Sequence, residues 1–231
     1  LVAGKVMVGE YNPIPYAQII TSTTHKTLRG PRGGMILCQK EFKEVVDKGC
    51  PITLGGPLPH VIAAKTVAFK EANTSSFCAY AEQIVKNAQA LANGLIYHGV
   101  HVLTGGTENH LMVFEVSSSL GLTGLQAENA LRQAHFTVNR NSIPFDKNGP
   151  WFTSGIRIGT AALTTLGMKE QEMTQIADWI YLLLKHTKPA KAEKGNSRSL
   201  VDIDSSILKE IQKHISVLLK RFPLYPDLIF D

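Results

Sequence analysis

The sequence predicts an α/β protein with one large domain or two small ones. Short apolar segments alternate along the chain with longer segments whose apolar residues recur at helical spacing. The chain has 231 residues, enough to bury a core, and its 44% hydrophobic and 19% charged residues are typical of a globular protein. A cluster of Asn, Thr and Ser at residues 73–77 predicts a boundary between residues 1–76 and residues 77–231.

The first part is expected to contain two strands and a helix. Residues 1–16 are expected to form a loop, because prolines within them disfavour a helix. Residues 17–20 and 34–38 are short and apolar, and they predict buried strands. Residues 40–48 predict a short helix. Residues 50–59 predict a loop, because they contain three prolines and a pair of adjacent glycines.

The remainder predicts a long helical region and then a second set of strands and helices. Helical spacing of apolar residues predicts helices at residues 61–72, 80–97 (ending near Gly94 and Gly99), 123–134, 170–184 and 207–219. Short apolar or glycine-bounded runs predict strands at residues 100–103, 111–116, 136–139 and 155–159. Thr123 and Gln126 have the spacing of a capping box. A polar segment predicts an exposed loop at residues 188–199, and residues 222–225 predict a packed tail.

Charge and cysteine content limit the classes of function. The net charge of +5 and the pI of about 9.1 favour anionic ligands such as phosphates and carboxylates. The sequence has no Lys/Arg block with interleaved aromatic residues, which argues against a nucleic-acid partner. Cys38, Cys50 and Cys78 lie far apart, so neither a disulfide framework nor a metal site is expected. No apolar run has the length of a membrane span and no signal peptide is visible, so we expect a reducing, cytoplasmic location.

The segment whose side chains are best suited to catalysis is residues 21–34, TSTTHKTLRGPRGG. Four small hydroxyl residues lead into His25 and Lys26, and a glycine-rich loop with Arg29 and Arg32 follows. A lysine held in a partly desolvated, positively charged setting becomes a usable amine nucleophile. Together with groups that bind anions, such a lysine suits pyridoxal phosphate. Local chemistry alone nevertheless favours a solvated loop lysine.

The whole segment closely resembles the cofactor-lysine segment of serine hydroxymethyltransferases, TTTTHKTLRGPRGG, with Ser22 in place of a threonine. Residues 53–62 and 139–160 also resemble this family, in the same order along the chain. The resemblance covers nearly the whole chain and weakens at residues 1–16 and 187–206.

The resemblance implies the aspartate-aminotransferase-like fold of pyridoxal-phosphate (PLP)-dependent transferases, known as fold type I. Residues 1–76 would be the C-terminal part of the large PLP-binding domain, and residues 77–231 would be the small α/β domain. The family's Asp-x-Ala-His motif lies just upstream of where this chain opens. We therefore expect the chain to be the C-terminal part of a longer enzyme and to be a poor catalyst alone.

The resemblance also implies roles for four residues of the first part. Lys26 would hold PLP covalently, and Thr23 and His25 would position that linkage. Arg32 would stabilise the surroundings of the cofactor. No residue is implied to bind a metal.

Further roles are implied for residues that bind phosphate and substrates. Gly55 and Gly56 would donate backbone N–H groups to the cofactor phosphate of a neighbouring subunit, although a simple turn is the alternative. Arg157 would bind the amino-acid carboxylate through two parallel hydrogen bonds, whereas simple strand alternation would place it in solvent. Asn141 and Ser142 would meet the pterin ring of tetrahydrofolate, although a turn before a proline is the alternative.

The implied reaction interconverts serine and tetrahydrofolate with glycine and 5,10-methylenetetrahydrofolate, a step of amino-acid biosynthesis and one-carbon metabolism. The implied assembly is a homodimer or tetramer with shared active sites. A threonine-aldolase-like PLP enzyme would also need Lys26 and Arg157, but not the pterin contact of Asn141. Two non-catalytic alternatives are a basic binding module, for example for RNA, and a remnant that only pairs with a full-length subunit.

Overall fold

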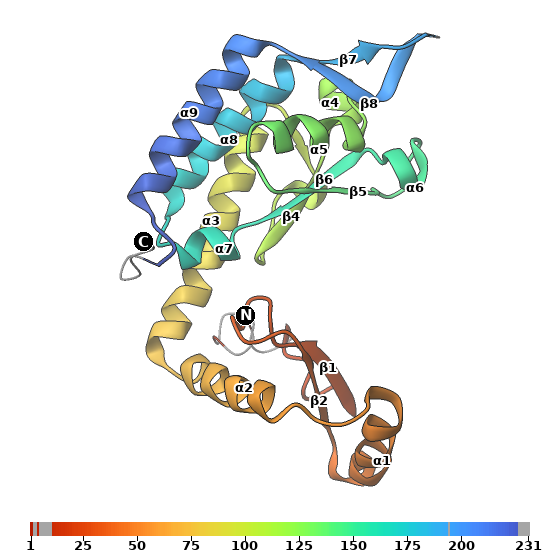
Figure 1. The fold of residues 1–231 in the computed structure, drawn as a ribbon, viewed down its shortest axis with the longest axis vertical. Coiled ribbons are helices and arrows are strands. Elements are labelled where there is room, and N and C mark those ends of the chain that lie inside the picture. Colours follow the sequence, from red (N-terminus) through yellow and green to blue (C-terminus); the bar gives the residue numbers. More distant parts are fainter. Residues whose placement is uncertain (2–3, 5–10, 194, 226–231) are drawn as a thin grey trace. The chain divides into compact units, whose positions relative to one another are not determined.

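The computed structural model of the chain describes residues 1, 4, 11–193 and 195–225. The chain divides into two compact units, Leu1–Glu82 and Gln83–Asp231, and each is described by itself (Figure 1). The long helix α3 (Ser75–Tyr97) contributes residues to both. Within the described residues, no helix is long and apolar enough to cross a membrane.

An antiparallel hairpin forms the sheet of the first unit. β1 (Ile19–Thr23) pairs with β2 (Gly34–Cys38), so that Thr23 lies opposite Gly34 at the turn end. β1 begins two residues later than expected and includes part of the hydroxyl segment. The expectation that both strands are buried is wrong. Ile19, Ile36 and Leu37 are 46%, 41% and 47% exposed, because no described element covers these side chains.

In the first unit, a short 3₁₀ turn and two helices follow the hairpin along the chain. The short 3₁₀ turn η2 (Lys40–Phe42) leads into α1 (Lys43–Leu54), and α2 (Pro59–Ala72) follows. α1 extends beyond the expected residues 40–48 and includes the first half of the expected loop. Pro51 is tolerated inside α1 near its end, where the N–H of Gly55 still donates to the Pro51 oxygen at 3.1 Å. The loop itself is therefore confined to residues 55–58.

A four-stranded sheet lies at the centre of the second unit, in the order β3-β4-β6-β5. All neighbouring strands are antiparallel. The strands are β3 (His101–Val102), β4 (Leu111–Glu115), β5 (Asn139–Asn141) and β6 (Gly155–Gly159). The strand expected at residues 136–139 is wrong, because the segment that pairs with β6 begins at Asn139. The strand expected at residues 100–103 is cut short by the 3₁₀ turn η3 (Leu103–Gly105).

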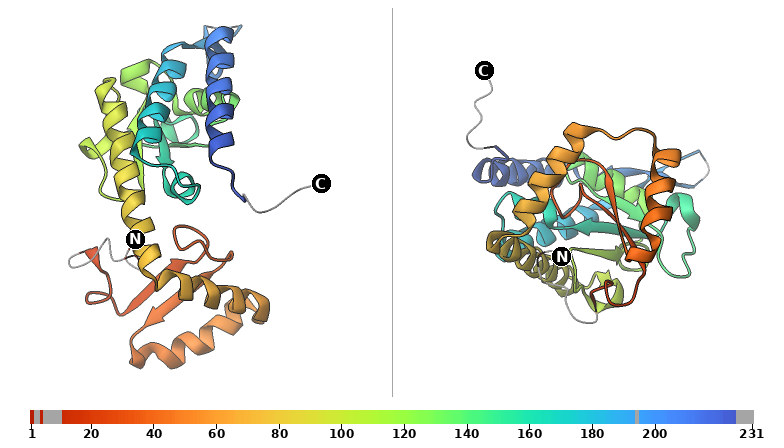
Figure 2. Two further views of the ribbon diagram at one scale, coloured as in Figure 1. Left: turned by 90° about the vertical axis from the view of Figure 1, so that its left-hand side faces the viewer. Right: turned by 90° about the horizontal axis from the view of Figure 1, so that it is seen from below.

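Helices cover one face of this sheet and form a single core with it. Ile156 and Ile158 of β6 point into this core with Phe114 of β4. Figures 1 and 2 show α3, α8 and α9 side by side. The helices of this unit after α3 are α4 (Ser117–Leu120), α5 (Gly124–Gln133), α6 (Gly149–Phe152), α7 (Ala161–Thr165), α8 (Glu170–Lys185) and α9 (Ser205–Arg221). The expected capping box of α5 is confirmed, since Thr123 and Gln126 exchange side-chain to backbone hydrogen bonds.

Three local expectations about the second unit are wrong. The loop expected at residues 188–199 is largely a hairpin of β7 (Thr187–Lys191) and β8 (Asn196–Ile203), because side chains of α5 donate to backbone oxygens of β8. Gly94 does not end α3. It lies inside the helix, where a Cβ atom would come within 2.6 Å of the Ala177 Cβ atom on α8. The tail at residues 222–225 is not fully packed, because Leu224 and Tyr225 are exposed.

Candidate active site

The loop that carries Lys26 is closed on a single buried residue, Thr24. We call residues 24–33 the Lys26 loop. Thr24 is 0% exposed, and its N–H donates to the Gly33 oxygen at 3.0 Å. Its own oxygen accepts from the N–H of Gly30 at 2.8 Å, and its hydroxyl donates to the Pro31 oxygen at 2.7 Å. These three bonds fix the two ends of the loop against each other.

Lys26 projects from this loop into solvent. Its side chain is exposed, and no described residue forms a hydrogen bond or ion pair with its ammonium group. The N–H of Arg29 donates to the Lys26 oxygen at 2.9 Å, which makes a tight turn directly after the lysine. The free primary amine is thus presented by an ordered backbone.

The neighbours predicted to assist Lys26 lie on the same loop or at the strand that leads into it. Nδ1 of His25 lies 3.3 Å from the oxygen and 3.4 Å from the nitrogen of Gly33, so the ring contacts Gly33 in either tautomer. Thr23 is half-buried at the end of β1, and Arg32 is exposed. His25 and Arg32 thus lie on the Lys26 loop itself, and Thr23 lies directly before it.

Arg29 holds the loop from outside, a role that the sequence did not reveal. Its φ angle is +56°, and its Cζ atom lies 4.1 Å from the ring centroid of Tyr80 and 5.6 Å from that of Phe77. A guanidinium over an aromatic face is a favourable contact. The two rings lie on α3, about fifty residues along the chain, so no local pattern could have predicted the contact.

Gly55 and Gly56 form a bare stretch of backbone after α1. Gly55 has a φ angle of +74°, and a Cβ atom placed on either glycine would meet nothing within 4 Å. The N–H of Gly55 already donates to the end of α1. Among the described residues the N–H of Gly56 has no acceptor, so Gly56 is the better candidate of the pair for binding an anion.

In the second unit, Arg157 and Asn141 lie on the same open face of the sheet. β6 alternates so that Ile156 and Ile158 are buried while Arg157 is exposed. Asn139 pairs directly with Arg157, and Asn141 pairs with Gly155. Paired residues point to one side of a sheet, so these polar side chains share what we call the Arg157 face. No described carboxylate pairs with the Arg157 guanidinium, which leaves its fork available to a ligand.

Ser142 follows β5 directly and is exposed. The Nδ2 atom of Asn141 donates to the Ser142 oxygen at 2.7 Å. Gly155 lets the two strands approach here, because a Cβ atom on it would lie 2.9 Å from the Asn141 oxygen and 2.7 Å from the Ile143 Cγ2 atom. The segment after β5 is therefore packed tightly against the start of β6.

Asp146 belongs to this region although no motif in the sequence pointed to it. Burial raises the pKa of its carboxyl group, but hydrogen bonds from the Ser154 hydroxyl and from backbone N–H groups lower it more, so the pKa lies below its ordinary value. Asp146 is thus a carboxylate at neutral pH. The one local signal for this role is the Asx-turn pattern, in which an Asp accepts from the backbone N–H two residues on, here that of Asn148.

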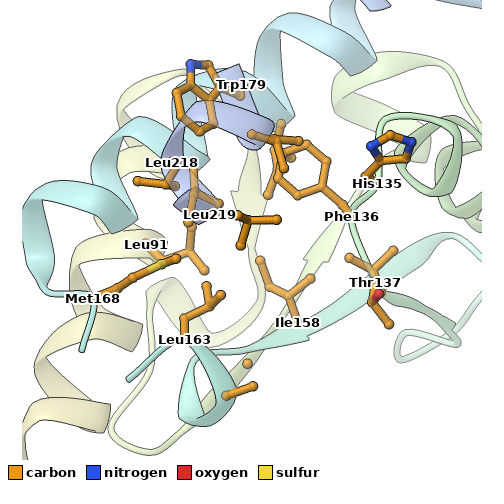
Figure 3. A pocket seen from close by; sticks show the side chains of 16 residues that line it. Leu91, His135, Phe136, Thr137, Ile158, Leu163, Met168, Trp179, Leu218 and Leu219 are labelled. Atoms are coloured by element: carbon orange, nitrogen blue, oxygen red, sulfur yellow. The ribbon is translucent and has the colours of Figure 1, made fainter. Parts of the chain in front are cut away.

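An apolar cavity of about 290 Å³ also lies in the second unit, and none of the predicted site residues lines it. Figure 3 shows Phe136, Leu163 and Leu219 around it, with Trp179 at one side. Its described lining contains no lysine, arginine or carboxylate. Since such walls do not suit a phosphate or a carboxylate, the cavity is not a candidate site for either group. The Lys26 loop of the first unit and the Arg157 face of the second unit are two separate candidate sites.

The burial of Thr24 leads to a stability prediction. Thr24→Val keeps the shape of the side chain but removes the hydroxyl that donates to the Pro31 oxygen. We expect the free energy of unfolding of the first unit to fall by about 1–2 kcal/mol, because a carbonyl acceptor loses its donor. Urea denaturation followed by circular dichroism measures the change.

Thr21→Val is the matched control for this prediction. Thr21 belongs to the same hydroxyl segment but is exposed on β1, and no side-chain hydrogen bond ties it to a described residue. We expect Thr21→Val to leave the unfolding free energy unchanged. Equal losses from both variants would show that the Thr24 hydroxyl has no special role in closing the loop.

Comparison with known proteins gives a consistent result. The family model described as serine hydroxymethyltransferase matches residues 1–180. The chain is 51% identical to the serine hydroxymethyltransferase of Chlamydia trachomatis serovar L2 over 229 residues, which are 99% of this chain and 46% of that protein. It is 51% identical to the serine hydroxymethyltransferase of Cutibacterium acnes (99% and 47% covered) and 52% identical to that of Treponema pallidum (99% and 40% covered). The chain thus spans about half the length of the curated relatives it matches.

Proposed function

Because the chain belongs to the serine hydroxymethyltransferase family, we propose that it is part of a PLP-dependent enzyme that interconverts serine and glycine. Tetrahydrofolate accepts the one-carbon unit and becomes 5,10-methylenetetrahydrofolate. The observation that carries the proposal is the exposed amine of Lys26 on an ordered loop, within a segment that matches the family's cofactor lysine. We further propose that the protein acts in one-carbon metabolism and amino-acid biosynthesis, in the cytoplasm.

Family membership confirms the fold class expected from the sequence, the α/β fold type I of PLP-dependent transferases. Within this fold we propose that residues 1–76 are the C-terminal part of the PLP-binding domain. Residues 77–231 are then the small domain. The boundary between the two compact units along the chain, after Glu82, lies a few residues further on and inside α3.

The donor groups of the first unit fit PLP. Lys26 offers a primary amine with no partner among the described residues for covalent attachment, and Arg32 adds positive charge to the same loop. Thr23 and His25 hold the backbone on either side of Thr24. When bound, the cofactor supplies an electron sink for the negative charge that develops on the amino-acid substrate. Gly56, with Gly55 shaping the turn, offers backbone to the phosphate of a cofactor bound in a second subunit.

The Arg157 face fits the two substrates. The unpaired guanidinium of Arg157 binds the carboxylate of serine or glycine, because the planar fork matches two carboxylate oxygens. Asn141 and Ser142 offer amide and hydroxyl groups that both donate and accept, which suits the edge of a pterin ring. We propose a homodimer or tetramer in which active sites are shared between subunits.

Steady-state kinetics of the purified protein that carries this chain tests the function. With PLP present, we expect glycine to form from serine only when tetrahydrofolate is added. Cleavage of threonine at a rate that does not depend on tetrahydrofolate would instead favour an aldolase. An absence of both reactions, with no cofactor absorption band, would exclude the PLP-enzyme assignment.

A further inference from the structure

The loop between β5 and β6 is organised around one carboxylate, that of Asp146. We call residues 142–154 the β5–β6 loop. Oδ2 of Asp146 accepts from the N–H of Ile143 at 3.2 Å and from the N–H of Ser154 at 2.9 Å. Oδ1 accepts from the N–H of Asn148 at 2.9 Å and from the Ser154 hydroxyl at 2.6 Å. All four partners are donors, so the position requires a group that only accepts.

These bonds tie both ends of the β5–β6 loop to one point. Ile143 comes immediately after Ser142, and Ser154 comes immediately before Gly155, the residue that pairs with Asn141. The carboxylate therefore sets the backbone on both sides of the Asn141–Gly155 pair. Any movement of Asp146 is expected to be transmitted to Asn141 and Ser142, because the strands are in close contact here.

A second set of contacts holds the loop from the β7–β8 hairpin. The Asn148 Nδ2 atom donates to the Ser154 hydroxyl oxygen at 3.0 Å, which extends the network of Asp146. Arg198 of β8 donates to the Asn148 Oδ1 atom at 2.9 Å, and its Cζ atom lies 4.1 Å from the ring centroid of Phe152. The loop is thus fixed from within by Asp146 and from outside by Arg198.

We infer that Asp146 is a positioning residue for tetrahydrofolate. It acts through Asn141 and Ser142, which it holds in place, and it need not touch the ligand itself. The inference rests on the proposed function, in which those two residues meet the pterin ring. It adds to that function by predicting that tetrahydrofolate binding depends on Asp146 more strongly than amino-acid binding does. The position of Arg157 depends less on Asp146, because β4 and β5 flank Arg157 on both sides within the sheet.

The variant Asp146→Asn tests the inference with little change in shape. Its amide nitrogen would face two of the four donors and could not accept from them. We expect the KM for tetrahydrofolate to rise about tenfold, because donors at the ends of the loop lose their acceptor. The KM for serine is expected to stay unchanged. Both constants are measured by steady-state kinetics on the purified protein that carries this chain.

Asp204→Asn is the matched control. Asp204 also accepts from a serine hydroxyl and a backbone N–H, those of Ser206 at 2.6 Å and 2.9 Å, but it does so at the start of α9. We expect it to change neither KM. The comparison separates the position of the carboxylate from the general effect of losing a capping aspartate.

The outcomes distinguish this inference from the function on which it rests. If the wild-type protein turns over serine and tetrahydrofolate but Asp146→Asn keeps the wild-type KM for tetrahydrofolate, the inference is overturned and the proposed function stands. Equal rises in both KM values would also overturn it, because they indicate a general structural role. If the wild-type protein has no such activity, the proposed function fails and the inference fails with it.

Discussion

Lys26→Ala is expected to abolish both cofactor attachment and serine turnover. The amine of Lys26 is the only group on the Lys26 loop able to attach PLP covalently, because the other cationic side chains there are guanidinium groups and an imidazole. We expect the cofactor absorption band to be lost and the turnover number to fall by a factor on the order of 10³ or more. Absorption spectra with added PLP and steady-state kinetics measure the two effects.

Two further variants define what Lys26 contributes. Lys26→Arg keeps the positive charge, but a guanidinium stays protonated and does not act as an amine nucleophile. We expect it to be as inactive as Lys26→Ala. Lys70→Ala, which removes an exposed lysine from the last turn of α2, should behave as wild type. Substantial activity in Lys26→Arg would mean that Lys26 supplies charge alone, and the assignment of the cofactor lysine would be wrong.

Arg157→Ala is the second variant with a large expected effect. Hydrogen bonds to charged groups contribute about 1.5–3 kcal/mol each, so losing two parallel bonds to the amino-acid carboxylate should lower kcat/KM for serine by roughly 10²–10⁴. Arg157→Lys should recover only part of this, since an ammonium group cannot donate in the same planar geometry. Kinetics with serine as the varied substrate measures both variants.

The control for Arg157 is Arg221→Ala. Arg221 pairs with Glu172 at 3.3 Å near the end of α9, and its loss should leave kcat/KM for serine unchanged. If Arg157→Ala also kept the wild-type value, Arg157 would be a solvated residue of an alternating strand and nothing more. The site for the carboxylate would then have to be sought elsewhere.

Local patterns predicted the parts of the fold whose causes are local. The capping box of Thr123 and Gln126 needs only residues of one turn, and the alternation that exposes Arg157 needs only β6 itself. The β7–β8 hairpin was missed because its composition is that of a loop. It is held by α5 side chains more than sixty residues away in the sequence, such as Asn129, which donates to the Ser199 oxygen.

The residues of the candidate sites likewise divide into those that a local motif predicts and those whose role depends on distant residues. The segment around Lys26 was recognisable as a motif, but its four hydroxyl residues looked equivalent, and the structure shows that Thr24 alone among them is fully buried. Asp146 was missed because its role depends on Ser154, which lies eight residues further on across the β5–β6 loop. Such a contact exists only after the loop has closed.

The closure of the Lys26 loop on Thr24 has a consequence for its dynamics. Three of the bonds that span the loop, two backbone bonds and one side-chain bond, meet at Thr24, so they are expected to break and re-form together. The loop then behaves as one small cooperative unit with two states, closed and open, and its intermediate states are sparsely populated. The amide protons of Thr24 and Gly30 should accordingly exchange with solvent through the same opening event. The free energy of that opening also sets how often Lys26 is displaced from its position in the closed loop.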